Sequence, residues 1–181
     1  MVASTDQELA ERVQNLFASS FLRVYTSNDV VGVEIGGALK NVFAIGAGMI
    51  DGLGFGLNTR AAMVTRGCSE MRKLGIAMGA EPLTMAGLAG IGDLMLTCYG
   101  TLSRNRQVGF RLGQGETLQD IMSSMSEVAE GVYTTPAALR LAEKHHLDLP
   151  IIKSVASVLE GRQTPLDAIK ELMERPQTME D

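Results

Sequence analysis

The longest hydrophobic stretch of the chain runs from residue 35 to residue 50, and Lys40 is its only charged side chain. Glu34 and Asp51 bracket this stretch. Its apolar positions recur closer to the period of a helix, about 3.6 residues, than to the alternation of a strand. The pattern therefore predicts a long buried helix from about Asp29 to Ile50.

The beginning of the chain has a different pattern. Thr5 and Glu8 have the spacing of a capping box, in which a hydroxyl and a carboxylate satisfy the first free amides of a helix. This helix is expected to end near Ala18, and a short strand is expected over residues 21–25. Everything after residue 27 looks helical, so this strand has no predicted partner.

Together these patterns predict a mainly α fold with two unequal parts. Residues 1–27 are interpreted as the trailing helix and strand of an α/β domain whose earlier part lies outside this sequence. Residues 28–181 are expected to form an all-helical domain.

Other helix boundaries are predicted from capping residues, prolines and glycines. The expected positions are an Asn58 cap for a helix over 59–78, a short helix over 82–89, a Ser103 cap for a helix to Leu112, a Thr117 cap, a Thr135-Pro136 start, a helix over 150–159 and a last helix from Thr164-Pro165 to about Arg175. The acidic tail from Gln177 to Asp181 is expected to fray.

Composition narrows the possible functions. The 181-residue chain is 45% hydrophobic and 20% charged, as in a typical globular protein, and its net charge of −5 without a basic cluster argues against nucleic-acid binding. The run 35–50 is too short and too interrupted to predict a membrane span. Cys68 and Cys98 are expected to be free thiols in a reducing compartment. No metal site is predicted, because the adjacent His145 and His146 would point to different faces of a helix.

Lys40 is the first candidate for chemistry. A lysine that is desolvated in an apolar helix loses affinity for its proton, which is how proteins make a general base that works near neutral pH. The alternative is that Lys40 extends its ammonium group to the surface along its own methylenes.

Asp93 is the second candidate, within the segment Gly90–Thr97. It has the position of a helix cap before Leu94, and the alternative is a carboxylate exposed for function at a glycine turn. Thr97 follows four residues later and would share its face of a helix.

The third candidate is the helix start Ser103–Arg106. A helix N-terminus offers free amides, and an adjacent arginine offers a planar fork, a combination suited to a phosphate monoester. A capped surface helix with solvated arginines is the alternative. The glycine-rich segment Asp51–Gly56 does not compete for this role, because it follows a helix and lacks the G-x-G-x-x-G spacing.

A base, a carboxylate and a phosphate-binding helix start form a chemically coherent set. They suit the oxidation of a phosphorylated secondary alcohol, in which a base removes the hydroxyl proton as hydride leaves.

Five motifs together resemble those of NAD(P)-dependent glycerol-3-phosphate dehydrogenases, in the order and spacing of that family. Each motif is weak alone, but the set covers nearly the whole chain. The motifs are Val24–Asp29, Gly37–Asn41, Ala89–Leu94, Ser103–Arg106 and Val128–Val132.

The resemblance implies a role for each matching residue. Lys40 corresponds to the catalytic lysine, which accepts a proton when sn-glycerol 3-phosphate is oxidised and donates one when dihydroxyacetone phosphate is reduced. Asp93 corresponds to an aspartate that contacts the lysine and the substrate hydroxyls. The implied substrate-binding residues are Lys40, Asn41, Asp93, Thr97, Ser103, Arg104 and Asn105, and the implied contacts to NAD or NADP are Arg104, Val128 and Glu130.

The resemblance also implies an architecture. Residues 28–181 would form the multi-helical domain shared with 6-phosphogluconate dehydrogenases, residues 1–27 would be a remnant of a Rossmann domain, and the protein would form a homodimer. Because the glycine fingerprint that holds a dinucleotide lies outside this sequence, the chain by itself is expected to be inactive.

Other interpretations stay open at this point. The helical domain could serve another two-domain hydroxyacid dehydrogenase, since a carboxylate would suit the arginine nearly as well as a phosphate. It could also be a dimerisation module without chemistry. The start of the chain shows no signal-peptide pattern, and a cytoplasmic or plastid location would suit the free thiols equally. The preference for NAD or NADP is undetermined.

Overall fold

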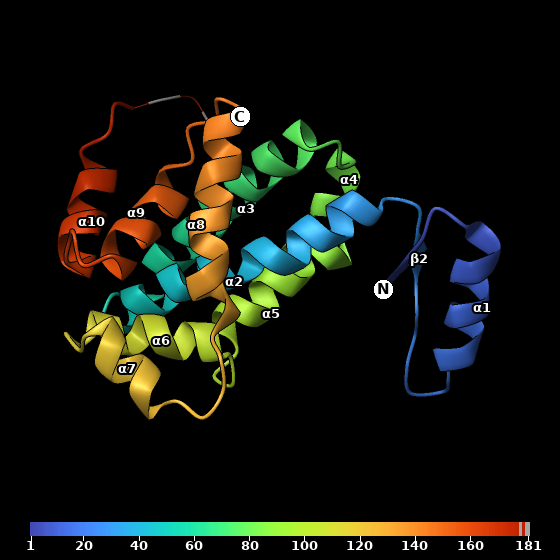
Figure 1. Cartoon of the computed structure of the whole chain (residues 1–181), viewed down its shortest axis with the longest axis horizontal. Coiled ribbons are helices and arrows are strands. Elements are labelled where there is room, and N and C mark those ends of the chain that lie inside the picture. The colour runs from blue at the N-terminus through green and yellow to red at the C-terminus, as the bar shows by residue number, and fades with distance from the viewer. Residues whose placement is uncertain (178, 180–181) are drawn as a thin grey trace.

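The computed structural model describes residues 1–177 and 179, and it confirms the mainly α fold. Figure 1 shows a small β–α–β unit at the N-terminus, set to one side of a larger helical body. The two parts are joined through the start of the long helix α2 (Val30–Gly52).

The N-terminal unit contains two short parallel strands and one helix. These are β1 (Val2–Ala3), α1 (Gln7–Phe17) and β2 (Thr26–Ser27), and Val2 pairs with Thr26.

The strand expected over residues 21–25 is therefore wrong, and so is the expectation that it lacks a partner. The strand that forms lies directly after it, and the Val2 amide donates to the Tyr25 carbonyl at 2.9 Å. Strands of two residues are too short to leave a recognisable period, so the sequence pattern does not reveal β1.

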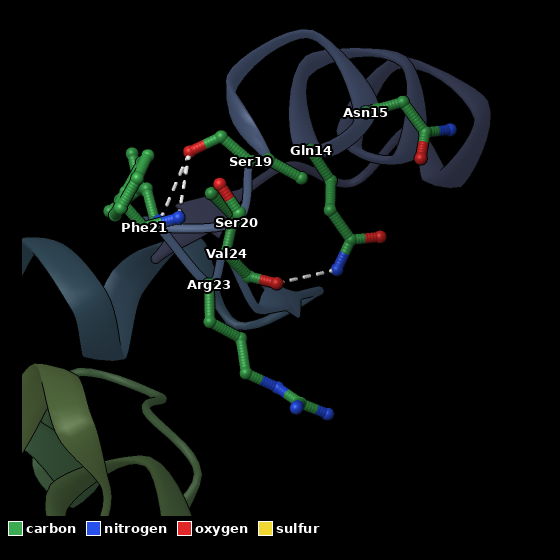
Figure 2. A pocket seen from close by; sticks show the side chains of 9 residues that line it. Gln14, Asn15, Ser19, Ser20, Phe21, Arg23 and Val24 are labelled. Carbon is green, nitrogen blue, oxygen red and sulfur yellow. Dashed lines mark hydrogen bonds between the residues drawn. The ribbon is translucent and has the colours of Figure 1, made fainter.

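A local turn takes the place of the expected strand. The Ser19 hydroxyl accepts the amides of Phe21 and Leu22, and the Gln14 side chain donates to the Val24 carbonyl (Figure 2). Serine binding to the backbone two and three residues ahead favours a turn over a sheet. This turn and the end of α1 line a hollow of about 400 Å³.

The start of α1 also differs from the expected capping box. Asp6, not Thr5, accepts the Leu9 amide at 3.0 Å, and the Ser4 hydroxyl accepts the Asp6 amide at 3.0 Å. Aspartate is a better cap than threonine, because its charge also suits the positive end of the helix dipole.

Much of the apolar surface of the N-terminal unit is open. Phe21 is 98% exposed, Leu16 78% and Phe17 58%. Large apolar side chains gathered on one small unit are typical of a surface that packs against another part of a protein.

Helix α2 runs through the centre of the helical body (Figure 1), as its sequence predicts. The Asp29 carboxylate caps it by accepting the Gly32 amide at 2.8 Å, and it also accepts the Glu81 amide at 2.8 Å. Helix α2 extends beyond the run 35–50 and is long and apolar enough to cross a membrane by length and composition alone. More than half of its most apolar window is buried inside the protein, as in the core helix of a globular domain.

The other elements surround α2. They are α3 (Leu57–Ala77), α4 (Pro82–Met85), the π-helix η1 (Leu88–Gly92), α5 (Asp93–Tyr99), α6 (Arg104–Gly113), α7 (Leu118–Ser124), α8 (Glu130–Lys144), α9 (Pro150–Leu159) and α10 (Pro165–Met173).

The caps predicted at Ser103, Thr117 and Thr164 and the helix start at Pro150 are confirmed. Two boundaries in the middle of the chain are wrong. Helix α3 has Gly56 at its cap position, so Asn58 lies inside its first turn. The short helix from Pro82 ends at Met85, and a turn at Ala86 and Gly87 then leads to the π-helix.

The start of α8 is also mispredicted. The helix begins at Glu130, and Pro136 lies inside it, although proline cannot donate to the carbonyl one turn earlier. Hydrogen bonds with Asn41 on α2 and Asn105 on α6 hold its first turn. Of the tail expected to fray, residues 178, 180 and 181 lie outside the described part of the chain.

Helices α2 and α6 meet in direct backbone contact. Gly48 and Gly52 on α2 face Gly109 and Gly113 on α6, and each pair spans about one helical turn. A Cβ atom on Gly109 would lie 1.9 Å from the carbonyl oxygen of Ile45. Only glycine permits this approach, which brings the start of α6 beside the middle of α2.

A buried carboxylate joins α3 to α9. Glu70 is 5% exposed and accepts the amides of Ile151 at 2.6 Å and Ile152 at 3.1 Å. Burial raises the pKa of Glu70 to about 7, although the two amides and Arg66 oppose this rise, and Asp148 adds to it.

Gly109→Ala is expected to lower the free energy of unfolding by about 1–3 kcal/mol, because the added methyl group forces α6 away from α2. Gly37→Ala is the matched control, since a Cβ at Gly37 in α2 would meet nothing within 4 Å. The control should gain up to about 1 kcal/mol from helix propensity. Urea unfolding of both variants measures the difference, and an undiminished stability of Gly109→Ala would contradict the described contact.

Glu70 should make stability depend on pH. The folded chain holds the Glu70 proton more tightly than the unfolded chain does, so the free energy of unfolding should fall as pH rises from about 4.5 to about 7, by up to about 3 kcal/mol. Glu70→Gln should remove this component, so its stability relative to the unaltered chain should improve between pH 5 and pH 8. Glu143→Gln, which changes an exposed carboxyl group, serves as the control. Parallel pH profiles for Glu70→Gln and the unaltered chain would rule the effect out.

Candidate active site

Lys40 and Asp93 form an ion pair on the surface between α2 and α5. Lys40 Nζ lies 2.5 Å from Asp93 Oδ2, and the two side chains are 25% and 31% exposed. Lys40 is thus partly desolvated, and it has a counter-ion. The structure brings together the first two candidates, which lie 53 residues apart in the sequence.

Asp93 does not cap a helix, which corrects one of its two interpretations. Its backbone is already helical, with φ −71° and ψ −34°, and it follows the π-helix η1 without a break. Close packing of η1 on α2 positions it, because a Cβ on Gly36 would lie 2.2 Å from the Ala89 carbonyl oxygen. The Asp93 carboxylate is therefore free to meet Lys40.

Thr97 lies one turn after Asp93, on the same face as predicted. Its hydroxyl donates to the Asp93 carbonyl at 2.7 Å and lies 3.5 Å from Oδ1 of the same residue. Thr97 therefore stays close to the carboxylate of the ion pair.

A network of buried amides lies next to the ion pair. Asn105 Nδ2 donates to Asn41 Oδ1 at 2.9 Å, and the Gly131 amide donates to Asn105 Oδ1 at 2.8 Å. Asn41 Nδ2 in turn lies 3.3 Å from Glu130 Oε2. Three helices, α2, α6 and α8, are thus connected through the two asparagines.

The helix start at Ser103 has one arginine available and one engaged elsewhere. The Ser103 hydroxyl accepts the Arg106 amide at 3.3 Å, so this cap is satisfied. The Arg104 side chain is 47% exposed and donates to Glu127 at 2.8 Å. Arg106 binds Asp51 at the far end of α2, at 2.5 Å, and therefore does not contribute to an anion site at Arg104.

Most of the residues implied by resemblance lie on a few connected elements. Hydrogen bonds or chain neighbours link Lys40, Asn41, Asp93, Thr97, Ser103, Arg104, Asn105 and Glu130. Val128 is 54% exposed, and no described contact joins it to this group. Two participants were not predicted: Gly131, which already stood inside a quoted motif, and Glu127, which has no signal in the sequence.

The two described hollows lie elsewhere. One is in the N-terminal unit (Figure 2), and the other, of about 420 Å³, lies between α8, α9 and α10. Within the described residues, no group of three or more histidine, cysteine, aspartate or glutamate side chains could hold a metal ion. The candidate site itself contains Lys40, Asp93, Arg104 and the amide network.

A family model described as the C-terminus of NAD-dependent glycerol-3-phosphate dehydrogenase matches residues 29–170. A chloroplastic glycerol-3-phosphate dehydrogenase [NAD(+)] of Arabidopsis thaliana is 56% identical over 180 residues, which are 99% of this chain and 43% of the relative. A glycerol-3-phosphate dehydrogenase [NAD(P)+] of Geobacter metallireducens is 57% identical over 175 residues, 97% of this chain and 52% of the relative. The chain thus spans about half the length of these curated relatives.

Solved structures give the same likeness. A crystal structure of glycerol-3-phosphate dehydrogenase from Coxiella burnetii superposes with a TM-score of 0.92 at 38% identity, covering 96% of this chain and 53% of that one. A Plasmodium falciparum structure superposes with a TM-score of 0.87 at 18% identity, a likeness of fold.

Proposed function

The chain belongs to the NAD-dependent glycerol-3-phosphate dehydrogenase C-terminal family, and on this premise we propose that it supplies the substrate-binding and proton-transfer residues that interconvert sn-glycerol 3-phosphate and dihydroxyacetone phosphate. The ion pair of Lys40 and Asp93 is the observation that carries the proposal. A partly exposed lysine held by one carboxylate is suited to exchanging a proton with a hydroxyl or carbonyl oxygen.

Lys40 is the proton donor when dihydroxyacetone phosphate is reduced. Its ammonium group gives a proton to the developing alkoxide at C2, and in the reverse direction the neutral amine takes the hydroxyl proton back. Asp93 holds Lys40 in place and can accept a hydrogen bond from a substrate hydroxyl. A bound dinucleotide would supply or accept the hydride.

Arg104 and the start of α6 bind the phosphate. The guanidinium can form paired hydrogen bonds with a phosphate, and its position at the N-terminus of a helix strengthens the attraction. Arg104 binds the exposed Glu127 in the structure, so a phosphate must replace that carboxylate.

The residues present fit one edge of a dinucleotide. Arg104, Val128 and Glu130 have exposed side chains, and of these Glu130 belongs to the amide network and Arg104 precedes Asn105 in the chain. The connection from β1 to α1, Ser4–Asp6, contains no glycine that would let a pyrophosphate approach its backbone. NAD or NADP would therefore be held mainly by other parts of a nucleotide-binding domain.

Residues 1–27 are the trailing part of that domain. The parallel β–α–β arrangement is the repeating unit of a Rossmann fold, and the exposed Phe21, Leu16 and Phe17 provide an apolar surface on which the rest of such a domain can pack. The assembled enzyme is a homodimer. Its location is cytoplasmic or plastid, where the free thiols Cys68 and Cys98 stay reduced.

Activity tests the proposal directly. The 181-residue chain alone should not reduce dihydroxyacetone phosphate, whereas a chimera that places the N-terminal half of the Geobacter metallireducens relative before it should do so with NADH or NADPH. Lys40→Ala in the chimera should lower kcat by about 10²–10⁴-fold, the usual contribution of a general acid or base.

Lys144→Ala, which alters an exposed lysine at the end of α8, is the matched control and should keep full activity. Unchanged turnover by Lys40→Ala would exclude Lys40 as the proton donor. It would favour a dimerisation or interaction module, which would not need this lysine.

Binding to the chain itself can be followed by NMR. Titration with glycerol 3-phosphate at low salt should shift the amides of Ser103, Arg104, Asp93 and Lys40, and Glu127→Gln should tighten binding several-fold by freeing Arg104. Glycerol, which lacks the phosphate, is the control ligand. If glycerol 3-phosphate moves other amides and spares these, the proposed substrate site is misplaced.

A further inference from the structure

The chemistry of the groups in the amide network determines which atom donates and which accepts in each hydrogen bond. The Gly131 backbone amide can only donate, so the group facing it at 2.8 Å must be the oxygen of Asn105. The Asn105 nitrogen then faces Asn41 at 2.9 Å, and this contact requires the oxygen of Asn41. The Asn41 nitrogen is thereby left for Glu130, a carboxylate that accepts it at 3.3 Å.

The network therefore closes on itself. It begins at the backbone of Gly131 and ends at the side chain of Glu130, which is the preceding residue. Asn41 on α2 and Asn105 on α6 both form hydrogen bonds with the first turn of α8. In addition, a Cβ on Gly131 would lie 2.6 Å from the Asn41 carbonyl oxygen. Helices α2 and α8 are therefore closely packed at this point.

Asn41 has no donor left for a ligand. One hydrogen of its side-chain nitrogen faces Glu130, and the other faces the Gly37 carbonyl at 3.5 Å. Asn41 and Asn105 are each only 7% exposed. Removing either amide from its partners would leave buried polar groups unsatisfied, which is costly. A substrate phosphate or hydroxyl can instead reach the exposed Arg104 without such a cost.

We propose that Asn41, the neighbour of Lys40 on α2, is a positioning residue and not a substrate ligand: together with Asn105 it holds the Glu130 carboxylate at the start of α8 in the place where it meets the dinucleotide. This inference rests on the proposed function, from which the role of Glu130 comes. It leaves the substrate contacts to Lys40, Asp93 and the start of α6 at Ser103 and Arg104.

Exchanging donor and acceptor in the hydrogen bond between Asn41 and Glu130 tests this bond in the active chimera. Asn41→Asp keeps the shape and the oxygen that serves Asn105, but it places a second carboxylate against Glu130. It should weaken NADH binding, followed by nicotinamide fluorescence, by about tenfold, as expected for a lost hydrogen bond to a charged group. The KM for dihydroxyacetone phosphate should change less than about twofold.

Glu130→Gln added to Asn41→Asp should restore the link, because the new amide can donate to the new carboxylate. NADH affinity should return to that of Glu130→Gln alone. A raised KM for dihydroxyacetone phosphate with unchanged NADH affinity would overturn the inference and make Asn41 a substrate ligand. Failure of Glu130→Gln to restore NADH affinity would also overturn it.

Hydrogen exchange in the 181-residue chain provides a readout independent of activity. The Gly131 amide should exchange about tenfold faster in Asn41→Asp and regain protection in the double variant, while circular dichroism checks that both variants fold. Unaltered exchange in Asn41→Asp would refute the network. If the unaltered chimera does not reduce dihydroxyacetone phosphate but Gly131 exchange responds as described, the proposed function fails and the positioning network stands.

Discussion

The contact between α2 and α6 is the constraint on which the rest of the helical body depends. Four glycines, Gly48, Gly52, Gly109 and Gly113, allow the two backbones to touch, and an added Cβ would collide with main-chain atoms rather than with adaptable side chains. At this separation the amide of Asn105 reaches Asn41 across the helices. A wider spacing would break this bond and leave the Asn105 nitrogen and the Asn41 oxygen buried without it, which is costly.

The candidate active site is a consequence of the same kind of packing. The π-helix η1 approaches α2 at Gly36, and α8 approaches it at Gly131, so glycines permit the close approach of η1, α6 and α8 to α2. Lys40 and Asn41 are adjacent in sequence but have different roles. Lys40 faces Asp93 and remains partly exposed, whereas Asn41 is buried in the network that holds Glu130. One helix thus presents a reactive side chain beside a rigid support.

The N-terminal unit differs from the helical body in how little of its apolar surface is buried. Its strands are two residues long, its sheet has two strands, and its apolar side chains are open to solvent. Two-stranded sheets are marginal without further packing. The helical body has a continuous core around α2, so the two parts of the chain differ in how much of their own stability they can supply.

The sequence by itself determined the helical class, the central helix, the caps at Ser103, Thr117 and Thr164, and the candidates Lys40, Asp93 and Arg104. These follow from local rules, namely periodicity, capping chemistry and short motifs, which need no knowledge of distant residues. Only the tertiary structure decided that Asp93 meets Lys40 rather than capping a helix, that α8 begins before Pro136, and that Arg106 turns away to Asp51. It also decided that β1 pairs with β2, and that Asn41 and Asn105 face each other. Each of these outcomes depends on which backbones approach closely enough to exchange hydrogen bonds, and that distance is set by side chains far apart in the sequence.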